Sequence, residues 1–216
     1  MYLLTETASP FALERWAAFF ANFGQFAKGF FYTLGISIGA LIVALLLGLI
    51  FGAMSSTHNK VLRGISRVYV EIFQNTPLLV QFVVVFYGIS ILTDGHIMIP
   101  ISLTAILCVG VYTGAYISEI IRTGIEAVPK GQTEAALSQG FTYADTMRII
   151  ILPQAVRTIL PPLTNQVVNL IKNTSTVAII SGADIMFTAK AWAYDTTNYV
   201  PAFAGAAFLY FIMCFP

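Results

Sequence analysis

The sequence predicts an all-α integral membrane protein of about five transmembrane helices. The chain is 57% hydrophobic and only 10% charged, whereas a soluble domain has about 45–50% apolar and about 25% charged residues. A soluble chain of 216 residues could not bury that much apolar surface, because most of its residues would still meet water. Apolar runs of about 20 residues, the length that crosses a bilayer, recur along the chain. Lipid is therefore the expected solvent.

Five apolar segments are predicted to span the membrane, and together residues 1–216 are predicted to form one transmembrane domain. These segments are Gly29–Met54, Val68–Leu92, Pro100–Ile121, Leu160–Ile180 and Val200–Pro216. The first contains no ionisable residue, and the others carry isolated polar residues at depth. The last stops in mid-span without a basic flank, so we expect the given chain to be truncated or disordered beyond that point.

The N-terminal segment does not resemble a cleavable signal. Met1–Gly24 contains Glu6 and Glu14 with a lone Arg15, instead of a basic head followed by a short apolar stretch and a small-residue cleavage site. The stretch Phe11–Phe26, rich in Phe and Trp, is expected to lie in the membrane interface before the first span.

The distribution of basic residues predicts the orientation, because cytoplasmic loops carry an excess of Lys and Arg. Seven of the 11 basic residues fall on one side of the membrane: Lys60, Arg63 and Arg67 after the first span, and Arg122, Lys130, Arg148 and Arg157 after the third. The opposite loops, Thr93–Ile99 and Ser181–Tyr199, contribute only Lys190. The N-terminus is therefore expected outside, with the first and third loops in the cytoplasm.

The longest hydrophilic connection is the loop at Thr123–Ile159, between the third and fourth spans. Within it, Lys130–Ser138 is predicted to be a short helix with Glu134 in an early turn, where the positive end of the helix dipole favours a carboxylate. Gly140 is predicted to end this helix in a left-handed conformation.

A second short helix is expected to follow, capped by Thr142 and running through Arg148. Pro153 is expected to break the chain before the next span. The resulting helix–Gly–helix element would lie at the cytoplasmic surface, where it is shaped to dock into another protein.

Several residues of this loop match a known pattern: Glu134, Ala135, Ala136, Gly140, Ile150, Leu152 and Pro153. With this spacing, the loop resembles the "EAA" loop of permease subunits in ATP-binding-cassette importers. Five further stretches resemble the polar amino-acid uptake branch of that family, which serves histidine, glutamine, glutamate or arginine. They are Asn75–Gln81, Pro129–Gln132, Leu152–Arg157, Pro161–Asn165 and Lys172–Ser175.

The resemblance implies the type I importer permease fold and a prokaryotic cell-membrane protein. It implies that Glu134, Ala135, Ala136, Gly140, Leu152 and Pro153 couple the permease to an ATPase. The implied partners are a second permease subunit (identical or related), two ATP-binding subunits and an extracytoplasmic amino-acid-binding protein.

The sequence agrees with ATP hydrolysis on a separate subunit, because it contains no Gly-x-x-x-x-Gly-Lys-Ser/Thr phosphate loop. We therefore expect the chain not to be an enzyme and to hold no cofactor, while ATP and Mg bind the partner ATPase. No metal-ligand cluster and no basic run for nucleic acid are present in the sequence.

Polar residues at membrane depth are the candidates for a substrate path. At 100° per residue, five residues of the fourth span fall within an arc of about 100°: Asn165, Asn169, Lys172, Asn173 and Thr176. This stripe could line a translocation path and meet an amino acid's carboxylate. Alternatively, it forms a helix–helix seam held by amide hydrogen bonds.

The second and third spans add two more candidates. Glu119 either faces the path or pairs locally with Arg122 through an i, i+3 contact. Gln81 shares a predicted face with Gln74, next to a kink expected at Pro77.

The first span contains four glycines that predict close helix packing: Gly35, Gly39, Gly48 and Gly52.

Two other functions are alternatives to the importer. A secondary carrier would show inverted repeats and broken helices, and neither is evident. An intramembrane enzyme would need a nucleophile with a base, or paired metal ligands, at depth, and the sequence shows neither.

Overall fold

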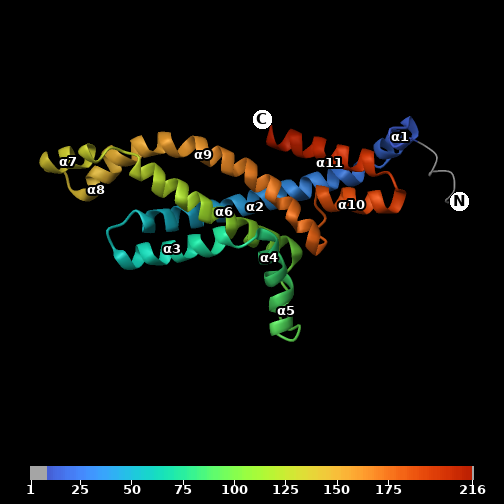
Figure 1. Ribbon diagram of the computed structural model, residues 1–216, viewed down its shortest axis with the longest axis horizontal. Coiled ribbons are helices and arrows are strands. Elements are labelled where there is room, and N and C mark those ends of the chain that lie inside the picture. The colour runs from blue at the N-terminus through green and yellow to red at the C-terminus, as the bar shows by residue number, and fades with distance from the viewer. Residues whose placement is uncertain (1–8, 216) are drawn as a thin grey trace. The chain divides into compact units, whose positions relative to one another are not determined.

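The computed structural model describes residues 9–215, and every regular element in that range is helical (Figure 1). The elements in order are α1 (Leu13–Ala21), α2 (Phe23–Ser55), α3 (Lys60–Asn75), α4 (Leu78–Val83), η1 (Val84–Gly88), α5 (Ile89–Leu92), α6 (Ile101–Glu126), α7 (Lys130–Ser138), α8 (Tyr143–Asp145), η2 (Thr146–Ile151), α9 (Leu152–Asn173), η3 (Thr174–Ile180), α10 (Ile185–Thr196) and α11 (Tyr199–Cys214). The predicted all-α class is therefore confirmed. Glu6 in the N-terminal segment and the predicted end of the last span at Pro216 lie outside the described residues.

Within residues 9–215, two helices are each long and apolar enough to cross a membrane, α2 with 33 residues and α6 with 26 residues. A third span results if α3 is taken together with the run from Leu78 to Leu92 across the break between them. The helix α11 is apolar but shorter, with 16 residues. The total of five spans and the outside position of the N-terminus stay predictions.

The chain divides into two compact units. Of the described residues, the first contains 9–39, 81–106 and 171–215, and the second contains 40–80 and 107–170. The prediction of a single domain stays a prediction.

The first unit has a core of aromatic and small side chains. The rings of Phe19, Phe26 and Trp192 meet edge to face, with centroids 4.8 Å apart for Phe19–Phe26 and 5.7 Å apart for Phe26–Trp192. Alanines on α10 and α11 complete the core and let these two helices lie side by side (Figure 1). The N-terminal helix α1 buries Phe19 but leaves Phe20 exposed, which suits the interfacial position predicted for it.

In the second unit, α2 and α6 pack through glycines. A Cβ atom at Gly48 would lie 2.4 Å from the Ile117 side chain, and one at Gly52 would lie 2.8 Å from Ile121. The predicted close packing is thus confirmed at these two positions, and at Gly39 in the first unit, where a Cβ would meet Ile106 at 2.9 Å. The prediction of close packing is wrong at Gly35, where a Cβ atom would meet open space.

The helix α3 attaches to the same unit through two side-chain hydrogen bonds. The Tyr69 hydroxyl donates to the Val111 carbonyl at 2.7 Å, and the Ser66 hydroxyl donates to the Phe51 carbonyl at 2.7 Å. Both residues are buried. These bonds satisfy polar groups inside an apolar setting, where an unpaired hydroxyl is costly.

The predicted second span is broken instead of kinked. The helix α3 ends at Asn75, and Thr76 adopts an extended conformation (φ −109°, ψ 133°), as a residue before proline prefers. A new helix, α4, begins at Leu78. Gln74 and Gln81 consequently lie on different helices, so the shared helical face predicted for them is wrong.

Candidate functional site

The element between α6 and α9 is built on a short helix with a defined C-terminal cap. The helix α7 runs from Lys130 to Ser138, as predicted. Gly140 follows with φ +87°, and its amide donates to the Leu137 carbonyl at 3.0 Å. The amide of Phe141 donates to the Ala136 carbonyl at 3.2 Å. These paired bonds form a Schellman motif, in which glycine takes the left-handed position without a Cβ penalty.

The second half of the element differs from its prediction. Thr142 does cap α8, since its side-chain oxygen accepts the Asp145 amide at 3.2 Å. The helix does not stop at Arg148, because a π-helical segment, η2, continues to Ile151 and leads directly into α9. Pro153 does not break the chain. It is the second residue of α9 and directly follows the π-helical turn of η2 without a break in the helix, so the break predicted at Pro153 is wrong.

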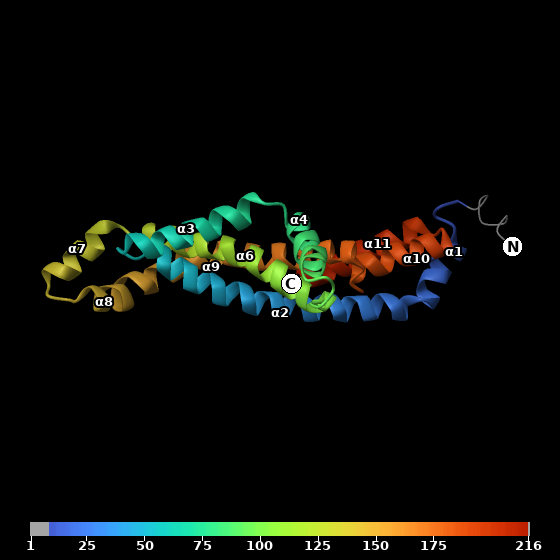
Figure 2. The ribbon, with the colours of Figure 1, turned by 90° about the horizontal axis from the view of Figure 1, so that it is seen from below.

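The element is anchored by a small apolar cluster of Val128, Ile151 and Ala155. The helices α7 and α8 with η2 lie next to each other, as Figure 2 also shows. Of the six predicted coupling residues, Ala136 is buried, whereas the other five are exposed: Glu134, Ala135, Gly140, Leu152 and Pro153. The exposed side of α7 therefore combines a carboxylate with small side chains, and a second protein can approach it closely.

A charged cavity of about 640 Å³ lies in the same unit, between the end of α2, helix α3 and the last turns of α6. Its charged lining comprises the cations Lys60, Arg63, Arg67 and Arg122 and the anions Glu71, Glu119 and Glu126. Both signs of charge therefore line one cavity, which is open to solvent, and most of its charged side chains are exposed.

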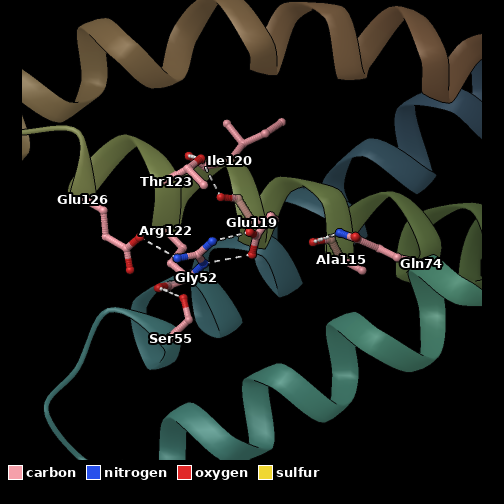
Figure 3. Close-up of polar contacts among 9 residues, drawn as sticks. All are labelled: Gly52, Ser55, Gln74, Ala115, Glu119, Ile120, Arg122, Thr123 and Glu126. Atoms are coloured by element: carbon pink, nitrogen blue, oxygen red, sulfur yellow. Dashed lines mark hydrogen bonds and ion pairs between the residues drawn. The ribbon is translucent and has the colours of Figure 1, made fainter.

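Arg122 organises the acidic side of this charged cavity (Figure 3). Its guanidinium donates to Glu119 through two nitrogens, one of them at 3.0 Å, and to Glu126 at 2.5 Å. The local i, i+3 pairing of Glu119 is thus present. Glu119 also lines the cavity, and its side chain is 39% exposed. Its place on a substrate path stays a prediction.

Sequence reasoning missed the basic side of this cavity. It used Lys60, Arg63 and Arg67 only as a signal of orientation, although their spacing of i, i+3 and i+7 places them on one face of α3. It also missed the polar contact of Gln74, which donates to the Ala115 carbonyl at 3.2 Å (Figure 3). The helical spacing of charges was the signal that could have found the basic face.

Four residues of the polar stripe predicted on the fourth span lie on α9, and the fifth, Thr176, lies on the 3₁₀ helix η3, so the single α-helical face predicted for all five is wrong. Asn165, Asn169 and Lys172 are exposed, and Asn173 is partly buried. The Asn169 amide donates to Gln166, three residues earlier on the same helix, at 3.1 Å. Helix α9 therefore presents these groups outward. Whether they line a path or meet another helix stays a prediction, as does a role for Gln81, which is partly buried on α4.

Apolar helices long enough to cross a membrane, a charged cavity and an anchored helix–Gly–helix element define a membrane permease that works with a partner protein. The chain belongs to the family of binding-protein-dependent transport system inner membrane components, whose model matches residues 44–216. The resemblance to permease subunits of ATP-binding-cassette importers is thereby confirmed.

Individual relatives and solved structures agree with this family. The chain is 38% identical to the probable glutamine ABC transporter permease protein GlnM of Bacillus subtilis (strain 168), over 91% of this chain and 90% of the relative. It is 35% identical to the glutamate/aspartate import permease protein GltJ of Escherichia coli (strain K12), over 78% of this chain and 76% of the relative.

Among solved structures, a chain of an amino acid ABC transporter with histidines matches with a TM-score of 0.85 and 32% identity, over 92% of each chain. A chain of the inward-facing MetNI methionine ABC transporter matches with a TM-score of 0.70 and 17% identity, over 89% of this chain and 93% of that one. The latter likeness shows the fold alone, and the type I permease fold is confirmed.

Proposed function

We propose that this chain is the transmembrane permease subunit of an ATP-driven importer for polar or charged amino acids. Glutamine and glutamate are the first substrates to test, because the relatives described above are named for glutamine and for glutamate/aspartate. The chain forms the translocation path, and a separate subunit hydrolyses ATP.

The capped helix α7 is the observation that carries this proposal. Gly140 holds a left-handed turn directly after α7, and the exposed Glu134 and Ala135 form a narrow surface on that helix. The ATPase receives this surface in a groove. ATP binding then shifts a two-state equilibrium of the spans, because the docked helix contacts the ATPase differently in the two states.

The charged cavity and the polar stripe on α9 supply the candidate path. An amino acid carries a carboxylate and an ammonium group, and the cavity offers cations on α3 and the carboxylates of α6. Glu119 is the acidic candidate at this cavity. The predicted path residues on α9 carry amides and an ammonium group, at Asn165, Asn169, Lys172 and Asn173, and Gln81 on α4 is a further candidate.

The partners in this proposal are a second permease subunit, identical or related, two ATPase subunits and an extracytoplasmic amino-acid-binding protein. The assembly lies in the cell membrane of a prokaryote, with α7 in the cytoplasm and the N-terminus outside. ATP and Mg bind the ATPase, and this chain holds no cofactor.

Reconstitution in proteoliposomes tests the proposal. The chain is co-expressed with candidate ATPase, second-permease and binding-protein subunits from the same organism, and uptake of radiolabelled glutamine and glutamate is measured with ATP inside the vesicles. We expect concentrative uptake that needs ATP and the binding protein. Sustained ATP turnover or concentrative uptake by the isolated chain would contradict the assignment.

A further inference from the structure

The helix α3 presents two stripes of exposed side chains on separate faces. The apolar stripe consists of Val61, Ile65, Val68 and Ile72, which are between 50% and 69% exposed. The cationic stripe consists of Lys60, Arg63 and Arg67, which are all exposed. At 100° per residue, the members of each stripe fall within an arc of about 60°. Both stripes therefore remain largely uncovered by the rest of the described chain.

The cations of this stripe are not neutralised within the chain. Among residues 9–215, none of the three forms an ion pair or a side-chain hydrogen bond. Across the charged cavity, Glu119 and Glu126 are both bound to Arg122. Glu71 is the one acidic residue of α3, and it too has no ion-pair partner among the described residues. Three cations therefore share this side of the cavity with one carboxylate, and an anion bound there would reduce the excess of positive charge.

The character of this surface changes along the helix axis. The cations occupy the first half of α3 and end at Arg67, whereas the apolar stripe continues to Ile72. With a rise of 1.5 Å per residue, Ile72 lies about 7.5 Å beyond Arg67 along the axis. A phospholipid has the same order of groups, with a charged phosphate followed by apolar acyl chains. Its headgroup stays at the membrane surface, so it can bind side chains that are open to solvent and needs no enclosed pocket.

We propose that the cationic and apolar stripes of α3 form a binding surface for an anionic phospholipid. Its phosphate meets Lys60, Arg63 and Arg67, and an acyl chain lies along Val68 and Ile72. Basic clusters between helices at the membrane surface bind such headgroups. The chain belongs to a family of inner membrane components, so the bilayer supplies this ligand.

An anionic phospholipid is the occupant that matches both stripes. A neutral lipid would leave the cations unpaired. A free phosphate or an acidic protein segment would pair with the cations and leave the apolar stripe uncovered. The inference needs a membrane protein of this family, and it does not rest on the proposed amino-acid substrate.

Lipid binding to the complete permease–ATPase complex tests this surface directly. The complex is delipidated in detergent and titrated with phosphatidylglycerol or phosphatidylcholine, and the bound lipids are counted by native mass spectrometry. We expect phosphatidylglycerol to bind at least about tenfold more tightly, because each Lys or Arg near a membrane surface strengthens the binding of anionic lipid about fivefold. The headgroup alone, sn-glycerol 3-phosphate, should not displace the lipid, because it lacks the acyl chains.

Arg63→Gln is the diagnostic variant, and Arg157→Gln is its matched control. Both arginines are exposed and form no ion pair within the described chain, but only Arg63 lines the charged cavity. Since neither change removes an ion pair, both variants should fold. Arg63→Gln should weaken phosphatidylglycerol binding about fivefold. Arg63→Lys should retain most of the binding, and Arg157→Gln should leave it unchanged.

A second pair of variants tests the apolar stripe. Ile72 on α3 and Ile42 on α2 are similarly exposed, at 52% and 55%. Ile72→Ser should weaken phosphatidylglycerol binding about threefold, because half of the side chain is available to an acyl chain. Ile42→Ser should have no effect on it. Unfolding midpoints in detergent check that every variant keeps its fold.

The other outcomes overturn the lipid site. They include equal affinity for the two lipids, equal effects of Arg63→Gln and Arg157→Gln, and equal effects of Ile72→Ser and Ile42→Ser. Displacement of the lipid by sn-glycerol 3-phosphate assigns the cations to a free anion, and displacement by L-glutamate assigns them to the substrate path. Binding to the isolated chain but not to the complex means that a protein partner covers α3. None of these results bears on the proposed importer, which is tested by uptake.

Discussion

The hydroxyl of Tyr210 on α11 donates a hydrogen bond to the carboxylate of Asp184 at 3.1 Å, and Asp184 is fully buried. The same carboxylate accepts the amides of Met186 at 3.1 Å and Phe187 at 2.9 Å, and so caps the N-terminus of α10. In addition, the Ile185 amide donates to the Thr33 hydroxyl of α2 at 3.1 Å. One carboxylate therefore fixes α10 against α11 at its starting turn.

Replacing this carboxylate should destabilise the first unit. Asp184→Ala removes a helix cap, worth about 1 kcal/mol, and also removes the acceptor of the Tyr210 hydroxyl proton, a hydrogen bond to a charged group worth about 1.5–3 kcal/mol. Asp184→Asn keeps an oxygen that can accept these bonds and should cost less. Thermal unfolding of the three proteins in detergent measures the order. An alanine variant as stable as the wild type would show that the contacts at Asp184 are dispensable.

Asp184 also predicts a dependence of stability on pH. It lies in the connection between the predicted fourth and fifth spans, and burial raises its pKa from 3.8 to about 6. The phenol groups of Tyr32 and Tyr210 face it. Because the folded state then binds the proton more tightly than the unfolded state, this group's contribution to stability falls as pH rises through that interval, by up to about 3 kcal/mol, and is constant above it.

Asp184→Asn provides the comparison, because it cannot titrate. Between about pH 4 and about pH 7, the unfolding midpoint of the wild type should fall relative to that of the variant. A constant difference between the two proteins across this range would show that the carboxyl is not shifted by burial.

The glycines of α2 allow a matched pair of substitutions. Gly48→Ala places a Cβ 2.4 Å from the Ile117 side chain, so either the side chain or the helix must move. Gly35→Ala meets nothing within 4 Å and should instead stabilise the helix by about 0.5–1 kcal/mol. We expect Gly48→Ala to cost about 1–3 kcal/mol through overpacking. Detergent unfolding midpoints that move in the same direction for both variants would contradict this packing.

The pair Gly35 and Gly48 also shows how far the sequence could predict the fold. A small-xxx-small pattern indicates close packing somewhere along a helix, but it does not say which glycine meets a neighbour. The cap at Gly140 was predictable because its hydrogen bonds join residues within six positions. The π-helical run at Thr146–Ile151 was not predicted, because local capping and proline signals gave no indication that the turn would widen.

The candidate site likewise has features that the sequence could predict and features that it could not. The Glu119–Arg122 pair follows from an i, i+3 spacing and was foreseen as one of two alternatives. The basic side of the charged cavity depends on α3 folding back beside α6 within the second unit, through contacts such as that between Tyr69 and Val111. The spacing of the charges on α3 could have indicated its basic face, but contacts so distant in sequence leave no local pattern, so the cavity that this face forms with α6 could be found only in the structure.

Glu119→Gln tests the charged cavity. The substitution removes the negative charge that faces the cavity and weakens the pairing with Arg122. Loss of a charged hydrogen bond at Glu119 costs about 1.5–3 kcal/mol. We therefore expect the kcat/KM of uptake to fall at least about tenfold. The control is Glu126→Gln, which removes the other carboxylate bound by Arg122 from a side chain that is 59% exposed. Equal losses in both variants would indicate that Arg122 needs neutralising and that Glu119 has no direct role.

Asn169→Leu distinguishes a substrate path from a helix seam on α9. The side chain is exposed and bonds only within its own helix in the described structure. If it lines the path, uptake should fall about fivefold or more, the effect of one lost hydrogen bond of about 1 kcal/mol, while the complex still assembles. Val167→Leu on the opposite face of α9 is the control. Loss of assembly with Asn169→Leu, measured by co-purification of the second permease subunit and the ATPase, would favour the seam.

Gly140→Val tests the docking element itself. Gly140 has φ +87° and open space around its Cβ position, so a substitution there introduces backbone strain of about 1–2 kcal/mol without a side-chain clash. The strained turn would shift the end of α7 and change the orientation of its exposed face relative to the ATPase. We expect normal membrane insertion, weaker co-purification of the ATPase and loss of substrate-stimulated ATP turnover.

Gly131→Val is the matched control for this change. Gly131 lies inside α7, also has open space around its Cβ position, and lacks a positive φ, so valine is accommodated there without the strain. The comparison isolates the left-handed turn from the mere addition of a bulky side chain to the docking helix. If both variants bind the ATPase and stimulate its turnover like the wild type, α7 is a passive connection and its proposed role is wrong. If both fail equally, added bulk on α7 is responsible, and the turn at Gly140 is not what aims the helix.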